Sequence, residues 1–154
     1  MYTIETSIDI AAPFATLRAA ISTRDGFRAW FADDTEVDAA GHYTFSFGPR
    51  VVTFTLERAD DRGVAMTCVR EQNNPDWLGT ELVIALTPLS DRQTRVELAH
   101  RGYPHKNECY ERCVEGWAHF LSSLALYATT GKGHPFDAKV AAPAAAPTTA
   151  AVAS

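Results

Sequence analysis

The sequence has few cysteines and no long hydrophobic run, and each shortage excludes a class of protein. Its three cysteines, Cys68, Cys109 and Cys113, are an odd number at spacings that fit neither a disulfide framework nor a zinc finger. No segment reaches the roughly 18 consecutive apolar residues of a membrane span, and the opening MYTIETSIDI lacks the basic region and apolar run of a signal peptide. We therefore expect free thiols, no membrane span and a cytoplasmic location.

Basic residues are also scarce. The chain carries 14 Lys and Arg against 19 Asp and Glu, a formal net charge of −5. Nucleic acids and anionic membranes are bound through a basic face, so we expect neither as a partner. The 154 residues are 46% hydrophobic and 21% charged, which suits a single folded core. We place that one domain at residues 1–136 and predict a disordered Ala/Pro-rich tail over 137–154.

Strand-forming runs and turn residues along the chain predict about seven antiparallel strands, with two short helices after the first strand. A β-branched strand opens the chain, and Pro13 suits the first turn of a short helix, which a second short helix follows. Gly, Asp and Pro clusters then separate six further strand-like runs. The predicted strands cover residues 2–10, 35–38, 42–47, 50–59, 64–70, 80–89 and 92–101, and the short helices cover 13–22 and 25–31.

Apolar residues alternate with polar ones along these strands, which predicts a sheet with one buried and one exposed face. The buried face needs a cover, and the run from Asn107 to Gly131 provides one, because Asn is a good N-cap and Gly a good helix terminator. About 23 residues make a helix about 34 Å long. Around this helix, Cys113 and Trp117 fall on the apolar side, Cys109 at its border, and His119, Ser122 and Ser123 on the polar side.

The segment NECYERCVEGWAHF, residues 107–120, could be a metal site or a redox pair, but helix geometry argues against both. His119 lies about 120° from Cys113 around the axis, so the two cannot share a tetrahedral centre with Cys109. Cysteines four residues apart on a helix have Cβ atoms about 5–6 Å apart, too far for a disulfide. We predict no metal and no cofactor, with Cys113 as a thiol facing the interior.

Several segments resemble one known family: IAAPFATLRAAIS, GFRAWF, GTELVIALTPL, TRVELAHRGY and GWAHFLSSLALYATTGKGHPF. Together they are similar to the family named for the activator of heat-shock-protein ATPase homologue (AHSA-like), part of the START/SRPBCC/polyketide cyclase superfamily. The resemblance covers residues 2–136. It implies an α+β helix-grip fold, in which an antiparallel sheet wraps a long C-terminal helix, with an apolar cavity between them. It does not imply one chemistry.

Binding of a small apolar or aromatic molecule in that space is the first functional hypothesis, because aromatic inner faces with a few polar tips suit a flat, mostly apolar ligand. A filled, dry core is the plainer alternative. His100 stands out on an inner face, where it is either a satisfied core histidine or a base. The candidate ligand-binding residues are Phe45, Phe47, Phe54, Met66, Trp77, Leu82, Ile84, Leu98, His100, Tyr110, Cys113 and Trp117.

Two other functions stay open. A cyclase or hydrolase could use His100 with Tyr110 or Cys113 to move protons, although the sequence shows no recognisable catalytic constellation, so enzymatic activity is uncertain. Alternatively, the outer surface could bind a protein, as a chaperone cofactor does, or a second copy of the chain in a homodimer. Leu126, an apolar residue on the polar side of the long helix, and the Ala/Pro tail are the features that favour a protein partner.

Overall fold

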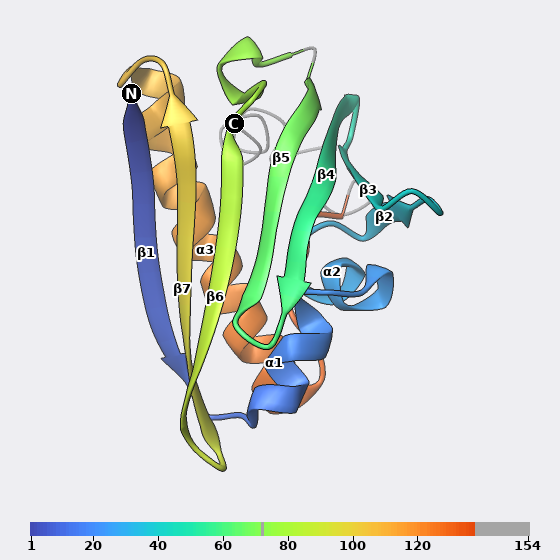
Figure 1. The fold of residues 1–154 in the computed structure, drawn as a ribbon, viewed down its shortest axis with the longest axis vertical. Coiled ribbons are helices and arrows are strands. Elements are labelled where there is room, and N and C mark those ends of the chain that lie inside the picture. Colours follow the sequence, from blue (N-terminus) through green and yellow to red (C-terminus); the bar gives the residue numbers. More distant parts are fainter. Residues whose placement is uncertain (72, 138–154) are drawn as a thin grey trace.

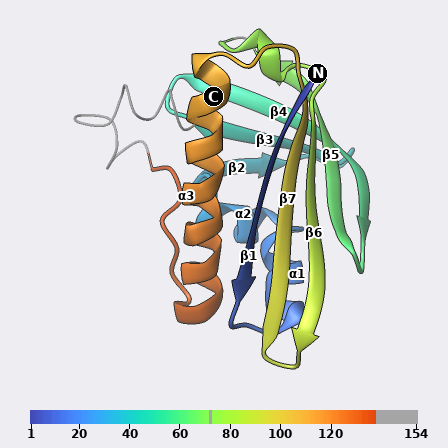
Figure 2. The same ribbon diagram turned by 90° about the vertical axis from the view of Figure 1, so that its left-hand side faces the viewer.

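The fold is a curved seven-stranded sheet packed against one long helix (Figures 1 and 2). The structure, a computed structural model, describes residues 1–71 and 73–137, so most of the predicted tail lies outside the described residues. The elements, in chain order, are β1 (Tyr2–Ile10), α1 (Phe14–Ala20), α2 (Arg24–Trp30), β2 (Asp34–Val37), β3 (His42–Phe47), β4 (Arg50–Asp60), β5 (Gly63–Glu71), the 3₁₀ helix η1 (Pro75–Trp77), β6 (Glu81–Ser90), β7 (Gln93–Tyr103) and α3 (Glu108–Thr130).

The strands lie in the order β1-β7-β6-β5-β4-β3-β2, and every neighbouring pair is antiparallel. Strands β2 to β7 follow one another as a meander, while β1 pairs with the last strand, β7. Helices α1 and α2 lie between β1 and β2 in the sequence, and they cover one end of the sheet (Figure 1). The predicted α+β helix-grip fold is therefore confirmed.

Helix α3 begins and ends where the sequence predicts. The Asn107 side chain accepts a hydrogen bond from the Tyr110 amide at 3.0 Å, and Glu108 and Glu111 lie in the first turn, where the helix dipole favours carboxylates. Gly131 ends the helix with φ of +87°, a conformation that suits glycine. Figure 2 shows α3 running along the inner face of the sheet from end to end.

Two irregularities in the strands change which side chains face the helix. Gly102 has φ of +98°, and the pairing of β1 with β7 shifts register beside it, so that both His100 and Tyr103 point inward. In β5 the register shift opposite Thr53 and Phe54 leaves Arg70 exposed and buries Glu71. Simple alternation would have placed Tyr103 and Glu71 on the outer face.

The prediction that one side of α3 is polar and exposed is partly wrong. Ser123 is buried, because the chain after α3 turns back along this side of the helix. The Ser123 hydroxyl donates to the Trp30 carbonyl and accepts from the His134 amide, both at 2.8 Å. Phe136 then forms an isolated β-bridge with Ala32. Two backbone hydrogen bonds make this bridge: the Phe136 amide donates to Phe31, and the Phe136 carbonyl accepts from Asp33. The returning segment is thus part of the packed structure.

Candidate functional site

The His100 side chain is the centre of a buried polar cluster between β7, η1 and α3. The inner face of β7 brings it beneath α3, and it is completely buried. Its ring Nε2 lies 2.7 Å from the Thr80 hydroxyl, and its Nδ1 lies 2.9 Å from the Tyr103 hydroxyl and 3.1 Å from the Trp117 indole nitrogen. Both ring nitrogens therefore have partners within the protein.

These contacts determine the tautomer of His100. An indole N–H can only donate, so Nδ1 accepts from Trp117, and the proton of the neutral ring is on Nε2. Nε2 then donates to the Thr80 oxygen, and the Thr80 hydroxyl donates in turn to the Trp77 carbonyl at 2.6 Å. Because Nδ1 has no proton, the Tyr103 hydroxyl is the donor in their contact. The chain of donors and acceptors is complete.

Burial keeps His100 neutral. Loss of water around the ring, and secondarily the positive charge of Arg50, lower the His100 pKa from its ordinary 6.5 to about 3. Burial likewise raises the pKa of the Tyr103 phenol far above its usual range. At neutral pH the imidazole is therefore a fixed hydrogen-bonding group, and it is a weak base.

Trp77 packs directly against His100 and comes from η1, in the connection between β5 and β6. Its indole ring stands edge-on to the His100 ring, with centroids 4.8 Å apart, and stacks on Trp117 with centroids 6.1 Å apart and planes 9° apart. Its N–H donates to the Cys113 sulfur at 3.4 Å. One side chain from a short connecting segment thus contacts the sheet, the cluster and the helix.

A buried ion pair lies beside Trp77. Arg50 and Glu71 are bonded through the Arg50 Nε and Nη2 atoms, the Nε bond being 2.8 Å long, and the Glu71 side chain is fully buried. The second Glu71 oxygen accepts from the amides of Asn73 and Asn74, at the start of the segment that holds Trp77. The Arg50 guanidinium lies 4.9 Å from the centre of the Trp77 ring, a cation–π distance.

The cysteines are free thiols, as predicted. Burial raises the pKa of Cys113 to about 11 and that of Cys68 to about 12, so both are protonated at neutral pH. Cys109, at the border of the helix stripe, accepts a hydrogen bond from the Asn74 side chain at 3.0 Å. Within residues 1–71 and 73–137, no group of three or more His, Cys, Asp or Glu side chains could hold a metal ion.

The structure brings most of the predicted ligand-binding residues together on the inner side of the sheet. Tyr110 differs: it is half-buried, and its hydroxyl donates to the Thr3 carbonyl at 3.2 Å instead of reaching His100. The others are buried, and they are Phe45, Phe47, Phe54, Met66, Trp77, Leu82, Ile84, Leu98, His100, Cys113 and Trp117. Of these, Phe54, Trp77 and Trp117 are in ring contact with His100.

Sequence reasoning missed Thr80, Tyr103 and the Arg50–Glu71 pair. The only local signal for Tyr103 is the glycine before it, since a Gly near a strand end favours a bulge that reverses side-chain direction. Arg50 follows a turn signal and Glu71 precedes a loop 21 residues later, so nothing local links them. Thr80 looks like an ordinary strand residue, and its role depends on the turn that places the Trp77 carbonyl beside it.

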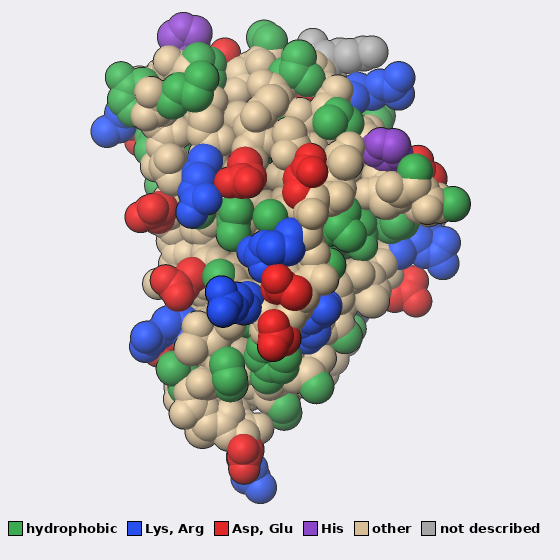
Figure 3. Space-filling view, in the orientation of Figure 1, with side chains coloured by type: hydrophobic (Ala, Val, Ile, Leu, Met, Phe, Trp, Pro, Cys, Tyr) green, Lys and Arg blue, Asp and Glu red, His purple; other side chains and the backbone are tan. Residues whose placement is uncertain are grey.

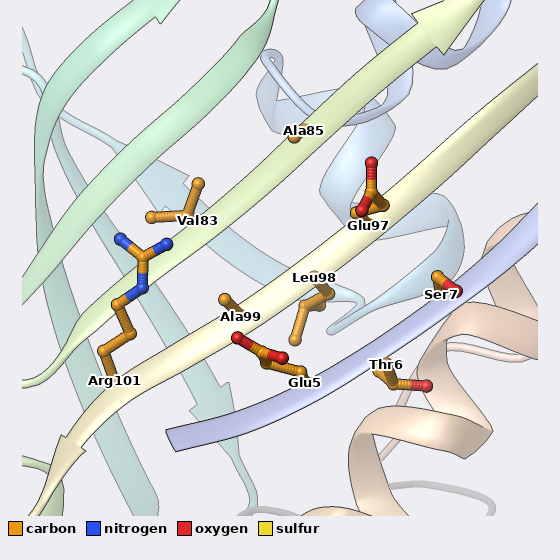
Figure 4. A pocket seen from close by; sticks show the side chains of 9 residues that line it. All are labelled: Glu5, Thr6, Ser7, Val83, Ala85, Glu97, Leu98, Ala99 and Arg101. Carbon is orange, nitrogen blue, oxygen red and sulfur yellow. The ribbon is translucent and has the colours of Figure 1, made fainter. Parts of the chain in front are cut away.

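A shallow hollow lies on the opposite, outer face of the sheet. It has a volume of about 360 Å³ and is formed by β1, β6 and β7. Its floor is made of small or apolar side chains such as Val83, Ala85 and Ala99, with Glu5, Glu97 and Arg101 around them (Figure 4). Acidic and basic side chains are interspersed over this face (Figure 3). Of the predicted ligand-binding residues, only Leu98 is among those that line it.

Among the helices that the structure describes, none is long and apolar enough to cross a membrane. A comparison with curated proteins gave no match.

Solved structures share this fold. An Aha1 dimer from Colwellia psychrerythraea is 26% identical with a TM-score of 0.75, and the match covers 86% of this chain and all of that one. A protein from Mesorhizobium loti is 17% identical with a TM-score of 0.69, covering 80% and 94%. DynU16, from the dynemicin biosynthetic locus, is 16% identical with a TM-score of 0.63, covering 85% and 48%. The last two show similarity of fold alone.

The sequence itself carries the family assignment. Residues 11–129 match the pattern described as activator of Hsp90 ATPase homolog 1-like protein, which spans most of the chain and includes α1, the sheet after β1 and nearly all of α3. The resemblance that the sequence motifs indicate is therefore confirmed, and the chain belongs to the family of activator of Hsp90 ATPase homolog 1-like proteins.

Proposed function

We propose that the protein binds a small apolar or aromatic molecule between the sheet and α3, at the cluster around His100. The observation that carries the proposal is the convergence of side-chain polar groups in an otherwise apolar interior: Thr80, His100, Tyr103 and Cys113, with the indole N–H groups of Trp77 and Trp117.

Stability alone does not require this cluster. Each buried polar group loses its hydration, and a hydrogen bond inside the protein does little more than offset that loss. Apolar side chains of the same volume would fill the space as well. Rings with a few fixed donors and acceptors are, in contrast, what a pocket for a flat ligand requires.

The same observations favour binding over catalysis. A general base works best with a pKa near the working pH, whereas that of His100 is about 3. The partners that the sequence suggested for proton transfer are also unsuitable, because the Tyr110 hydroxyl is bonded to Thr3 and Cys113 is a protonated thiol.

Native mass spectrometry of the purified protein, and titration with a panel of aromatic and aliphatic compounds followed by tryptophan fluorescence, test the proposal. We expect a bound or bindable compound with Kd below about 100 μM. The His100→Leu variant should lose at least tenfold in affinity, and Tyr110→Phe, as the matched control, should keep it. A wild-type protein that binds nothing at millimolar concentration would overturn the proposal.

Interaction with another protein is a second candidate, favoured by the hollow on the outer face of the sheet. The similar Colwellia protein is a dimer, so a second copy of this chain is one partner to test, and a chaperone ATPase is the other. Ala99→Arg, in the floor of the hollow, should abolish either association, whereas Thr44→Arg on β3 should not. A monomer by sedimentation at high concentration that captures no purified Hsp90 would eliminate this candidate.

A further inference from the structure

We propose that the indole of Trp77 occupies the binding site itself, and that the molecule which replaces it is a planar heteroaromatic compound with one N–H donor, of the indole class. This inference rests on the proposed function and goes further, because it names the ligand class and the residue that competes with the ligand.

The surroundings of the Trp77 ring have the composition of a binding pocket for a flat molecule. Trp117 lies nearly parallel to it, 9° between planes, and the His100 and Phe54 rings meet it edge-on or tilted, with centroids 4.8 and 6.0 Å away. The Arg50 guanidinium lies 4.9 Å from the ring centre. Stacking, edge contacts and a cation–π contact together select a flat, electron-rich ring.

The ring nitrogen of Trp77 meets acceptors that belong to side chains. Its N–H donates to the Cys113 sulfur at 3.4 Å, and the Tyr103 oxygen also accepts from it, an interaction that works against the rise in the Tyr103 pKa. Tyr103 and Cys113 are themselves fixed by His100 and by α3. A ligand of the same shape with one N–H would find the same two acceptors, whereas a ring without a donor would leave both without this hydrogen bond.

Trp30 shows what an ordinary buried tryptophan looks like in this protein. It is completely buried, but its N–H donates to a backbone carbonyl, that of Ala20, at 2.8 Å. Its aromatic neighbours are the two phenylalanines Phe27 and Phe31, and it is the last residue of α2. Among the residues that the structure describes, no histidine ring packs on it and no arginine lies over it. Trp30 is therefore the natural control for the chemistry around Trp77.

Displacement of Trp77 requires breaking its contacts with α3, where its ring stacks on Trp117 and its N–H bonds to the Cys113 sulfur, and where Asn74 donates to the Cys109 sulfur at 3.0 Å. On the sheet side its segment is fixed by Thr80 and Glu71. On the helix side, Asp76 meets His105 and Asn107 at 3.3 and 3.4 Å. These contacts are at the long end of the hydrogen-bond range, and His105 and Asn107 are exposed, so both contacts are weak. Figure 2 shows η1 and the start of α3 at the same end of the molecule.

Removing the competing side chain tests the inference. In Trp77→Gly we expect free indole to bind at least tenfold more tightly than in the wild type, because a site that is occupied part of the time lowers the apparent affinity in proportion. Calorimetry measures both values. Trp30→Gly, which removes an equal volume elsewhere, should show no such gain. Trp77→Leu, for which a smaller gain is expected, serves if Trp77→Gly does not fold by circular dichroism.

Donor specificity is the second measurement. Trp77→Gly should bind indole at least fivefold more tightly than 1-methylindole or naphthalene, and Tyr103→Phe in that background should reduce the preference. Equal gains in Trp77→Gly and Trp30→Gly would mean that indole merely fills any cavity, and equal binding of 1-methylindole would refute the ligand class. Either result leaves the proposed function intact if the wild type binds a compound from the panel. Failure of the wild type to bind anything refutes the proposed function instead.

Discussion

The two ends of the interior satisfy their polar atoms in different ways. Beneath α1 and α2, side chains bond to backbone carbonyls: Trp30 to Ala20, Tyr43 to Ser22, and Ser123 to Trp30. We call this the helical end. Around η1, at what we call the cluster end, side chains bond mainly to other side chains, as His100, Tyr103 and Trp117 do. Backbone carbonyls are fixed by the fold, whereas side-chain partners can be changed one at a time. We therefore expect any chemistry specific to this protein at the cluster end.

The largest loss in the free energy of unfolding should come from breaking the buried Arg50–Glu71 ion pair at the cluster end. Glu71→Leu removes the carboxylate that pairs with the buried Arg50 charge, and we expect a loss of about 3–5 kcal/mol in the free energy of unfolding. Adding Arg50→Met should restore at least about 1 kcal/mol of it. Urea unfolding of the two variants measures this. At the helical end, Ile21→Val should cost about 0.5–1.5 kcal/mol, the loss of one methyl group. A double variant no more stable than Glu71→Leu would contradict the assignment of a single coupled pair.

The second effect is a dependence on pH that belongs to the cluster end. His100 has a folded-state pKa of about 3, below its ordinary 6.5, so below pH 6.5 the unfolded chain takes up a proton that the folded protein does not. Stability that is present above pH 6.5 is then lost as the pH falls, by about 1.4 kcal/mol per unit. Between pH 6.5 and 4.5 the wild type should lose about 2–3 kcal/mol more than His100→Leu. Parallel stability curves for the two proteins would show that His100 is not held neutral.

The smallest effect distinguishes the two tyrosines near the start of α3. Tyr103→Phe removes a donor to His100 without leaving a cavity, and we expect a loss of about 1 kcal/mol. Tyr110→Phe removes an exposed hydrogen bond to Thr3 and should change the free energy of unfolding by less than about 0.5 kcal/mol. Thermal unfolding of both variants at pH 7 resolves the difference. If Tyr110→Phe proved the more costly, the cluster would extend to the helix border.

The order of elements could be predicted because its signals are local. Alternating apolar residues, turn residues such as Gly and Asp, and the caps at Asn107 and Gly131 each act within a few positions. His100 could be placed on the inner face by the same alternation, which holds from Val96 to His100.

The composition of the cluster could not be predicted, because bulges and tertiary contacts decide it. One residue with positive φ, Gly102, turns Tyr103 inward and reverses the alternation. The pairing of Arg50 with Glu71 requires β4 and β5 to be aligned first. A helical wheel puts Ser123 on the polar side of α3, because it does not include the chain segment that returns over this side.

The return of the chain over α3 also determines when the molecule can finish folding. Ala32 pairs with Phe136, which lies more than a hundred positions later in the chain. The first strand, β1, pairs with the last strand, β7. A chain emerging from the ribosome can form the hairpins from β3 to β7 early, but β1 remains an unpaired strand until residue 103 is available. Folding should therefore be slow for a domain of this size, and the last step should be closure of the segment around Phe136 on α2 and β2.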